Sequence, residues 1–244
     1  MKACRSSEQG VTLLELLIAV ALLSLLTLGM FMAMQLGLSA FTRADDKLMT
    51  NRRAVGAQRI MQSELEGLMP VMGVCGAPGG GAAVKLPFFQ GQAQTMRLVS
   101  TFSLQQGWRG QPQILEMVVI PGETAGVRLV VNEIPYSGPW GTKQVCTARA
   151  EGGPPLFAPV QPGPRSFVLA DKLAYCRFTY LTPPPQSNPN LPGSWTPTWG
   201  VLGWPLAVRV EMAPLEADPS RVQPITISAP IYVHRSLEFP YADL

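Results

Sequence analysis

The stretch GVTLLELLIAVALLSLLTLGMFMAMQLGLSAF, from Gly10 to Phe41, decides how this 244-residue chain is organised. A short polar and basic lead precedes it, and an apolar run begins at Val11 without a gap. From Leu16 to Met34 the run contains no charged residue. At a rise of about 1.5 Å per residue, a run of this length can cross the hydrocarbon core of a bilayer as one helix. The pattern therefore predicts a transmembrane helix over residues 11–40.

Glu15 is the one charged residue between Val11 and Met34. A carboxylate inside a membrane helix is costly, so it normally has a function and a partner. If the peptide bond after Gly10 is cut, Val11 carries a free α-amino group. In an assembly of such helices, Glu15 of one subunit would face the amino terminus of the next. That contact would neutralise two charges and set the stagger between neighbouring helices.

The N-terminal segment resembles the type IV prepilin signal. The shared features are Gly10 before the cut, an apolar start at Val11, and Thr12-Leu13-Leu14 followed by Glu15. Val11 stands where Phe or Met is usual. The resemblance implies that residues 1–10 are a leader peptide. It also implies that a prepilin peptidase cuts between Gly10 and Val11 and that Val11 becomes N-methylated.

A plain signal anchor and a cleaved secretory signal are the two alternatives for this segment. A secretory signal places a small-residue cleavage site after its apolar region. Neither Gly29 nor the Ser39-Ala40 pair makes a convincing site of that kind. The basic lead favours a cytoplasmic N-terminus, so we expect a single-pass protein of the bacterial inner membrane with its domain in the periplasm.

Residues 41–70 are predicted to continue the helix in amphipathic form, ending at Pro70. We expect the apolar stripe of this segment to pack on the following domain, with a partner helix as the alternative. The stripe consists of Phe41, Ala44, Leu48, Val55, Ile60, Met61, Leu65 and Leu68.

The rest of the chain is predicted to be a Gly-rich linker over 71–94, a β-rich domain over 95–234 and a poorly ordered tail over 235–244. Short apolar segments bounded by turn residues indicate strands, and their close spacing favours antiparallel pairing. Pro230 indicates that the last strand lies at a sheet edge. The fold class is therefore α+β, with a long N-terminal helix packed on an antiparallel, two-sheet, pilin-like domain. The predicted strands are Thr95–Phe102, Gln113–Ile120, Gly126–Asn132, Ser166–Ala170, Ala174–Leu181, Leu206–Ala213 and Ile225–Val233.

Composition narrows the functional classes. The formal net charge is +3, and Arg52-Arg53 is the only adjacent basic pair, so nucleic acid is not an expected partner. Beyond the anchor, roughly 200 residues remain, which is enough for one domain with a core of its own.

Three cysteines remain once the leader is removed, namely Cys75, Cys146 and Cys176, which allow three pairings. Cys75 and Cys146 lie in Gly/Pro-rich surroundings, whereas Cys176 lies in an apolar strand-like run. We favour a Cys75–Cys146 disulfide with Cys176 buried. A metal site is not expected, because there is no CxxC motif and His234 is the only histidine.

The sequence does not indicate an enzyme, and we expect no catalytic residues and no cofactor. Ser/His/Asp catalysis would have to use His234, and the Gly-rich loop from Val74 to Ala83 lacks the GK[ST] ending of a phosphate-binding loop. A pair of carboxylates that meet in space stays open as an alternative. The candidates are Glu116, Glu123, Glu133, Glu151, Glu211 and Glu216.

The C-terminal half resembles the J-type minor pseudopilin of type II secretion, general secretion pathway protein J. The residues that carry this resemblance are Phe178-Thr179-Tyr180-Leu181, Trp195, Trp199 and the run from Trp204 to Val210. Trp204 stands where Leu is usual, and the Pro-rich segment before it is long. On physical grounds alone, the tryptophans are expected to bury area beneath this loop.

The resemblance implies assembly with I- and K-type minor pseudopilins and the major pseudopilin at a pseudopilus tip that helps to export folded cargo. A minor pilin of a type IV pilus or DNA-uptake system is the nearer alternative, and it would admit nucleic acid as a partner. A membrane-anchored envelope enzyme or ligand-binding module is the more distant one.

Overall fold

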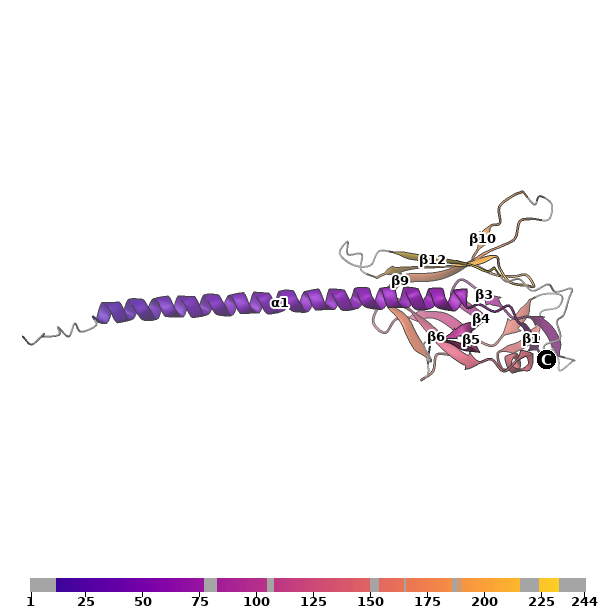
Figure 1. Cartoon of the computed structure of the whole chain (residues 1–244), viewed down its shortest axis with the longest axis horizontal. Coiled ribbons are helices and arrows are strands. Elements are labelled where there is room, and N and C mark those ends of the chain that lie inside the picture. The colour runs from indigo at the N-terminus through magenta and orange to yellow at the C-terminus, as the bar shows by residue number, and fades with distance from the viewer. Residues whose placement is uncertain are drawn as a thin grey trace, which may run out of the picture. The chain divides into compact units, whose positions relative to one another are not determined.

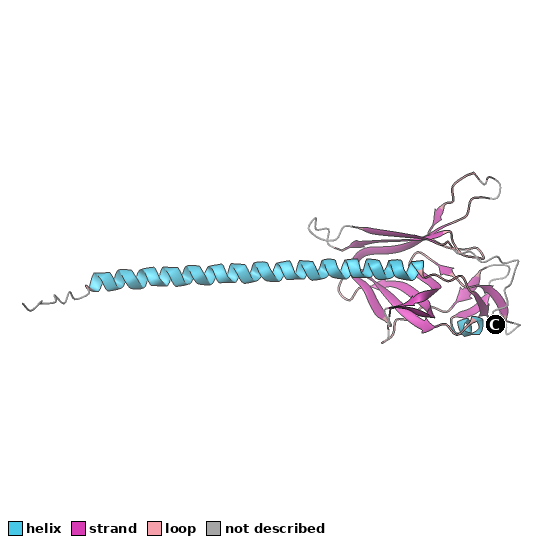
Figure 2. Ribbon diagram, in the orientation of Figure 1, coloured by secondary structure: helices cyan, strands magenta, loops and turns pink. Residues whose placement is uncertain are grey.

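The computed structural model describes residues 12–76, 83–104, 108–149, 154–164, 166–185, 188, 190–215 and 224–232. The chain divides into two compact units, Met1–Thr50 and Asn51–Leu244. Helix α1 (Leu13–Glu66) begins in the first unit and ends in the second. Strands dominate the described part of the second unit (Figures 1 and 2). The predicted α+β class, with a long apolar N-terminal helix and a large antiparallel sheet, is confirmed.

Helix α1 ends at Glu66, before the predicted stop at Pro70. The chain leaves the helix early because it pairs with strand β4 (Thr95–Ser103). Leu68 forms an isolated bridge to Ser100, and the Met69 N–H donates to the Val99 carbonyl over 2.8 Å. Backbone bonding to the sheet therefore replaces the last helical turn that the sequence predicts.

The main sheet of the described chain has eight strands in the order β12-β11-β9-β6-β5-β4-β3, with β10 paired to β9. All of its pairings are antiparallel. Strand β12 lies at the edge of the sheet, where Pro230 predicts it. The other strands of this sheet are β3 (Gln90–Gly91), β5 (Trp108–Pro121), β6 (Val127–Pro135), β9 (Phe167–Leu181), β10 (Trp195–Thr196), β11 (Ala207–Pro214) and β12 (Ile225–Pro230).

Strand β9 joins two segments that the sequence separates, Ser166–Ala170 and Ala174–Leu181. The polar Asp171-Lys172 pair between them lies within the strand, and Lys172 has a φ of 53°. The Lys172 N–H donates to Asp171 Oδ1 over 2.8 Å, which stabilises this left-handed position. Pairing with β6 on one side and β11 on the other carries the strand through the irregularity.

The predicted linker over 71–94 is structured where it is described, so the linker prediction is wrong for those residues. Strands β1 (Met72–Cys75) and β2 (Val84–Pro87) form a two-stranded antiparallel sheet, and β3 belongs to the main sheet. A disulfide joins Cys75 to Cys146, the pairing that the sequence favours. The Thr142 hydroxyl accepts a hydrogen bond from the Val74 N–H, so β1 is held by side-chain as well as covalent contacts.

The irregular segment after β6 contains a 3-10 helix, η2 (Pro139–Gln144), and a second two-stranded sheet of β7 (Cys146–Arg149) and β8 (Pro155–Phe157). The described chain therefore has one large sheet and two small ones, rather than two sheets. Arg97 on β4 connects the segment after β6 to the main sheet, because its Nη2 donates to the Ala158 carbonyl over 2.6 Å.

The main core gathers side chains from helix α1 and from both halves of the large sheet. Met61 and Leu65 of the helix belong to the same buried cluster as Leu98 on β4 and Phe178 on β9. Burial of such a face is what holds a helix end on a sheet, because each large apolar side chain contributes about 1.5–3 kcal/mol. A smaller cluster surrounds the disulfide and includes Phe88.

Two of the three tryptophans named above are buried, as the physical interpretation predicts. Trp199 and Trp204 belong to the main core, and Trp199 Nε1 donates to the Gly203 carbonyl over 3.0 Å. Trp195 is half-buried, and the Arg209 guanidinium lies 3.8 Å from the centre of its ring. The tail over 235–244 lies outside the described residues.

Candidate membrane-anchor and assembly site

The N-terminal part of helix α1 is the candidate anchor. Leu13–Asp45 is the one helical segment of the described chain that is long and apolar enough to cross a membrane. At about 1.5 Å per residue, the segment is longer than the roughly 30 Å hydrocarbon core of a bilayer. The predicted span from Leu16 to Met34 lies inside it.

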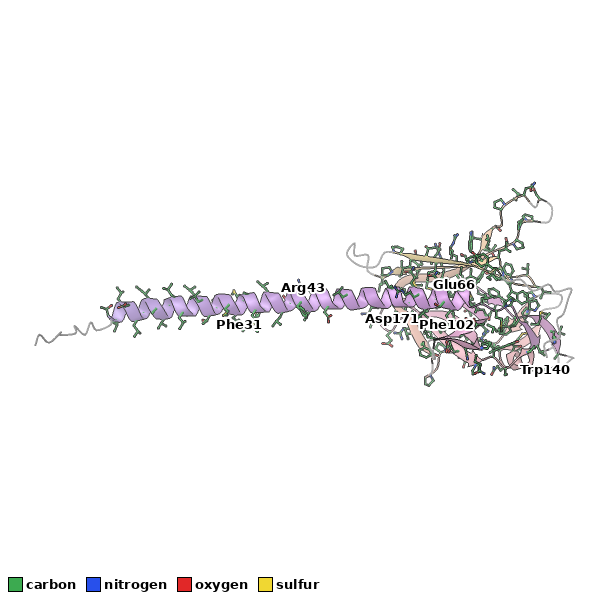
Figure 3. All side chains as sticks on the ribbon, viewed as in Figure 1. Phe31, Arg43, Glu66, Phe102, Trp140 and Asp171 are labelled. Carbon is green, nitrogen blue, oxygen red and sulfur yellow. A yellow bond between two sulfur atoms is a disulfide. The ribbon has the colours of Figure 1, made fainter. Side chains whose placement is uncertain are left out.

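Every residue from Leu13 to Asp45 is exposed in the described structure. Met30 is 79% exposed and Phe31 is 60% exposed, and large apolar residues occur on every side of the helix. Figure 3 shows the labelled Phe31 side chain standing out from the ribbon. A helix that is apolar all round is stable only when lipid or other protein surrounds it. The anchor therefore requires a cover that the described residues do not supply.

The serine and threonine hydroxyl groups of the anchor form hydrogen bonds within the helix itself. Ser24, Thr27, Ser39 and Thr42 each donate to the backbone carbonyl three residues earlier, over 2.8–3.1 Å. Unsatisfied polar groups are costly in hydrocarbon, so these bonds make the four residues compatible with a lipid surrounding.

Glu15 lies in the first turn of α1. Its backbone N–H points at Thr12, with 3.3 Å to the hydroxyl oxygen and 3.1 Å to the carbonyl oxygen. Thr12 therefore acts as a helix cap, a role that the sequence analysis missed although the Thr-x-x-Glu spacing is its usual signal. A carboxylate in the first turn also complements the positive end of the helix dipole. Gly10 and Val11 lie outside the described residues.

The second half of α1 presents a buried face from Ala57 onward. Ala57, Met61 and Leu65 are each at most 5% exposed, whereas Val55 is 48% and Leu48 56% exposed. Within the second unit, Met61 and Leu65 of the predicted stripe are therefore buried, whereas Val55 is exposed.

Three of the candidate carboxylates each contact a basic side chain. Glu116 bonds Arg97 and Asn132, Glu123 bonds Arg128, and Glu211 bonds Arg177. The described residues include no group of three or more His, Cys, Asp or Glu that is arranged to hold a metal ion. Glu151, Glu216 and His234 lie outside the described residues.

Cys176 on β9 is a free, buried cysteine, as the sequence analysis predicts. Burial raises the pKa of its thiol from 9.0 to about 12. Since the thiolate is the reactive form, burial makes this thiol a weak nucleophile in the folded chain.

Comparison with known proteins gives one match. The family model of the prokaryotic N-terminal methylation motif matches residues 5–31. A search of curated proteins and a search of solved structures each found no match. The matched residues contain the predicted cleavage position, Glu15 and the first half of the exposed apolar helix. The motif and the helix together support a type IV pilin-like protein, of the kind that a prepilin peptidase processes and that assembles with similar subunits.

Proposed function

We propose that the chain is a minor pseudopilin of a type II secretion system, most like the J-type subunit. One observation carries the proposal. The exposed apolar helix carries Glu15 at the fifth position after Gly10. The same helix continues to Met61 and Leu65, which lie in the core of a β-rich domain. Such a helix serves as a membrane anchor before assembly and as a packing surface afterwards.

In this proposal the peptidase cuts after Gly10 and methylates Val11, leaving an amino group at the helix start. Glu15 of one subunit then pairs with the amino terminus of its neighbour. The pair is stable because it removes two uncompensated charges from an apolar surrounding. The chain acts through assembly rather than catalysis and uses no cofactor.

The J-type assignment is supported by where the resembling residues lie. Phe178 and Tyr180 on β9 face Val210 and Val208 on β11 in register, and all four are buried. Trp204 lies in the same core, next to the strand that it precedes. The buried residues of the resemblance thus pack together within the main core, which supports the J-type assignment.

The proposed location is the inner membrane, with the N-terminus in the cytoplasm and the domain in the periplasm. The proposed partners are the I- and K-type minor pseudopilins, the major pseudopilin and, at the tip, secreted cargo. The strand-rich domain would cap the pseudopilus.

Co-purification tests the assignment. The tagged full-length chain is produced in its own host and isolated with mild detergent, and the bound proteins are identified by mass spectrometry. We expect I- and K-type subunits to co-purify with the wild-type chain and to be lost from the Glu15→Ala variant. Recovery of pilus or DNA-uptake subunits instead would overturn the type II assignment while leaving the pilin-like anchor intact.

A further inference from the structure

Glu64 is a buried carboxyl group on the docked face of helix α1. Its side chain is 1% exposed, and it lies one residue from Leu65 and three from Met61 in the core. Neither carboxyl oxygen has a hydrogen-bond partner of normal geometry among the described residues, although the Ser100 hydroxyl lies close enough to affect its ionisation. An ionised group in such a position is strongly destabilising, so the folded domain favours the neutral acid.

Among the side chains that the structure describes, none gives Glu64 a compensating positive charge. On β4 the Ser100 hydroxyl, which is neutral, interacts with Glu64. On β6 the Glu133 carboxylate acts on it as a like charge, while that carboxylate accepts hydrogen bonds from the Ser103 hydroxyl and the Leu104 N–H. Arg97 on β4 forms its ion pair with Glu116 rather than with Glu64.

The resulting environment shifts the ionisation of Glu64. Burial raises its pKa from 4.5, the Ser100 hydroxyl opposes the shift and Glu133 adds to it, and the result is a pKa of about 8. Because the group is neutral in the folded domain and ionised in water at neutral pH, its proton is coupled to docking of the helix.

The helix end around Glu64 is bonded directly to β4. The Ser100 hydroxyl donates to the Glu64 backbone carbonyl over 3.0 Å, and the Thr101 N–H donates to the Gly67 carbonyl over 2.8 Å. The carboxyl and the anchoring bonds therefore lie in the same few residues. Solvating the carboxylate requires those residues to separate from the strand.

We propose that Glu64 is a protonation switch: its neutral carboxyl holds the last turns of α1 on the sheet, and its ionisation loosens them. The direction follows from linkage. The docked form keeps a proton that the undocked form releases above pH 4.5, so each rise of one pH unit increases the undocking constant about tenfold. The increase levels off near pH 8, where the docked form also ionises.

Hydrogen exchange on the full-length chain in detergent micelles tests the switch. Protection of the amides of residues 57–66 is measured from about pH 5 to pH 9, with correction for the intrinsic exchange rate. We expect the wild-type undocking constant to rise about a hundredfold over two pH units below the plateau. Glu64→Gln, which mimics the neutral acid, is expected to remove this rise. Glu66→Gln, at an exposed position on the same helix, is expected to keep it.

A flat wild-type profile, or the same slope in Glu64→Gln, would overturn the proposal. If Glu64→Gln fails to fold, the carboxyl carbon of Glu64 in the wild-type chain is titrated directly by NMR. A midpoint near 8 supports the switch, and a midpoint near 4.5 overturns it.

Discussion

Gly67 and Ser100 pack so closely that a Cβ atom on Gly67 would lie 2.6 Å from Ser100 Oγ and 3.2 Å from the Phe102 backbone nitrogen. Gly67→Ala should therefore push the helix end away from β4 and lower the free energy of unfolding by about 1–3 kcal/mol. Chemical denaturation of the full-length chain in detergent measures the loss.

Gly56→Ala is the matched control, because a Cβ there meets nothing within 4 Å. It should leave stability unchanged or raise it by about 0.5–1 kcal/mol through helix propensity. Adding Ser100→Ala to Gly67→Ala should recover part of the loss, since it removes the closest contact. Equal effects of the two glycine substitutions would contradict the close approach.

Arg97 and Glu116 form a buried ion pair at 2.7 Å, with side chains only 1% and 7% exposed. Arg97→Met leaves the Glu116 carboxylate without its cation, so we expect a loss of about 3–5 kcal/mol. Arg177→Met breaks the exposed pair with Glu211 and should cost at most about 1 kcal/mol. The double variant Arg97→Met, Glu116→Gln should be more stable than Arg97→Met alone. Similar losses for the two single arginine variants would argue against the buried pair.

The Cys75–Cys146 disulfide closes a loop with a sequence separation of 71 residues. Replacing both cysteines with serine should lower the free energy of unfolding by about 2–5 kcal/mol. Chemical denaturation measures the loss.

Alkylation tests the burial of the free cysteine, Cys176. At pH 8 the buried thiol of Cys176, with its pKa of about 12, should react only after unfolding. Rapid alkylation of Cys176 in the folded chain would contradict its burial.

Glu15→Ala removes the acid that we pair with the neighbouring amino terminus. Leader processing should remain largely intact, because the cleavage position is unchanged, while incorporation into the assembled filament should fall severely. Immunoblotting of membrane and filament fractions separates the two effects. Glu66→Ala, farther along the same helix, serves as the control and should assemble normally. Normal assembly of Glu15→Ala would remove the proposed role.

Local patterns predict much of the fold. The runs at 95–102 and 113–120 lie in strands, and the run that begins at Ile225 forms strand β12 up to Pro230, because alternating or continuous apolar residues bounded by Gly and Pro have few other stable arrangements. Pro230 marks the edge strand β12 because proline lacks the donor that a central strand needs. These features depend on neighbouring residues, which a sequence displays directly.

Features that depend on distant pairing are harder to predict. Strand β9 continues through Asp171 and Lys172 because β6 and β11 hold it, and β1 forms within a Gly-rich segment beside a disulfide partner far along the chain. The burial of Glu64 has the same origin. An acidic residue outside the apolar stripe is normally exposed, whereas Glu64 is buried and its backbone carbonyl bonds Ser100 on β4.

At the candidate site, the anchor is predictable because a long uncharged run has one stable environment. The capping role of Thr12 is also predictable from the sequence, because Thr12 and Glu15 have the spacing of a capping box. The sequence does not predict where the buried face of the helix begins, at Ala57. That position depends on how far the sheet extends along the helix.

N-terminal sequencing and intact mass of the chain, isolated from membranes of its own host, test the central claim most directly. The account predicts a mature protein that begins at Val11 and carries one added methyl group on its amino nitrogen. An intact Met1, or a first residue beyond Gly29, would contradict it.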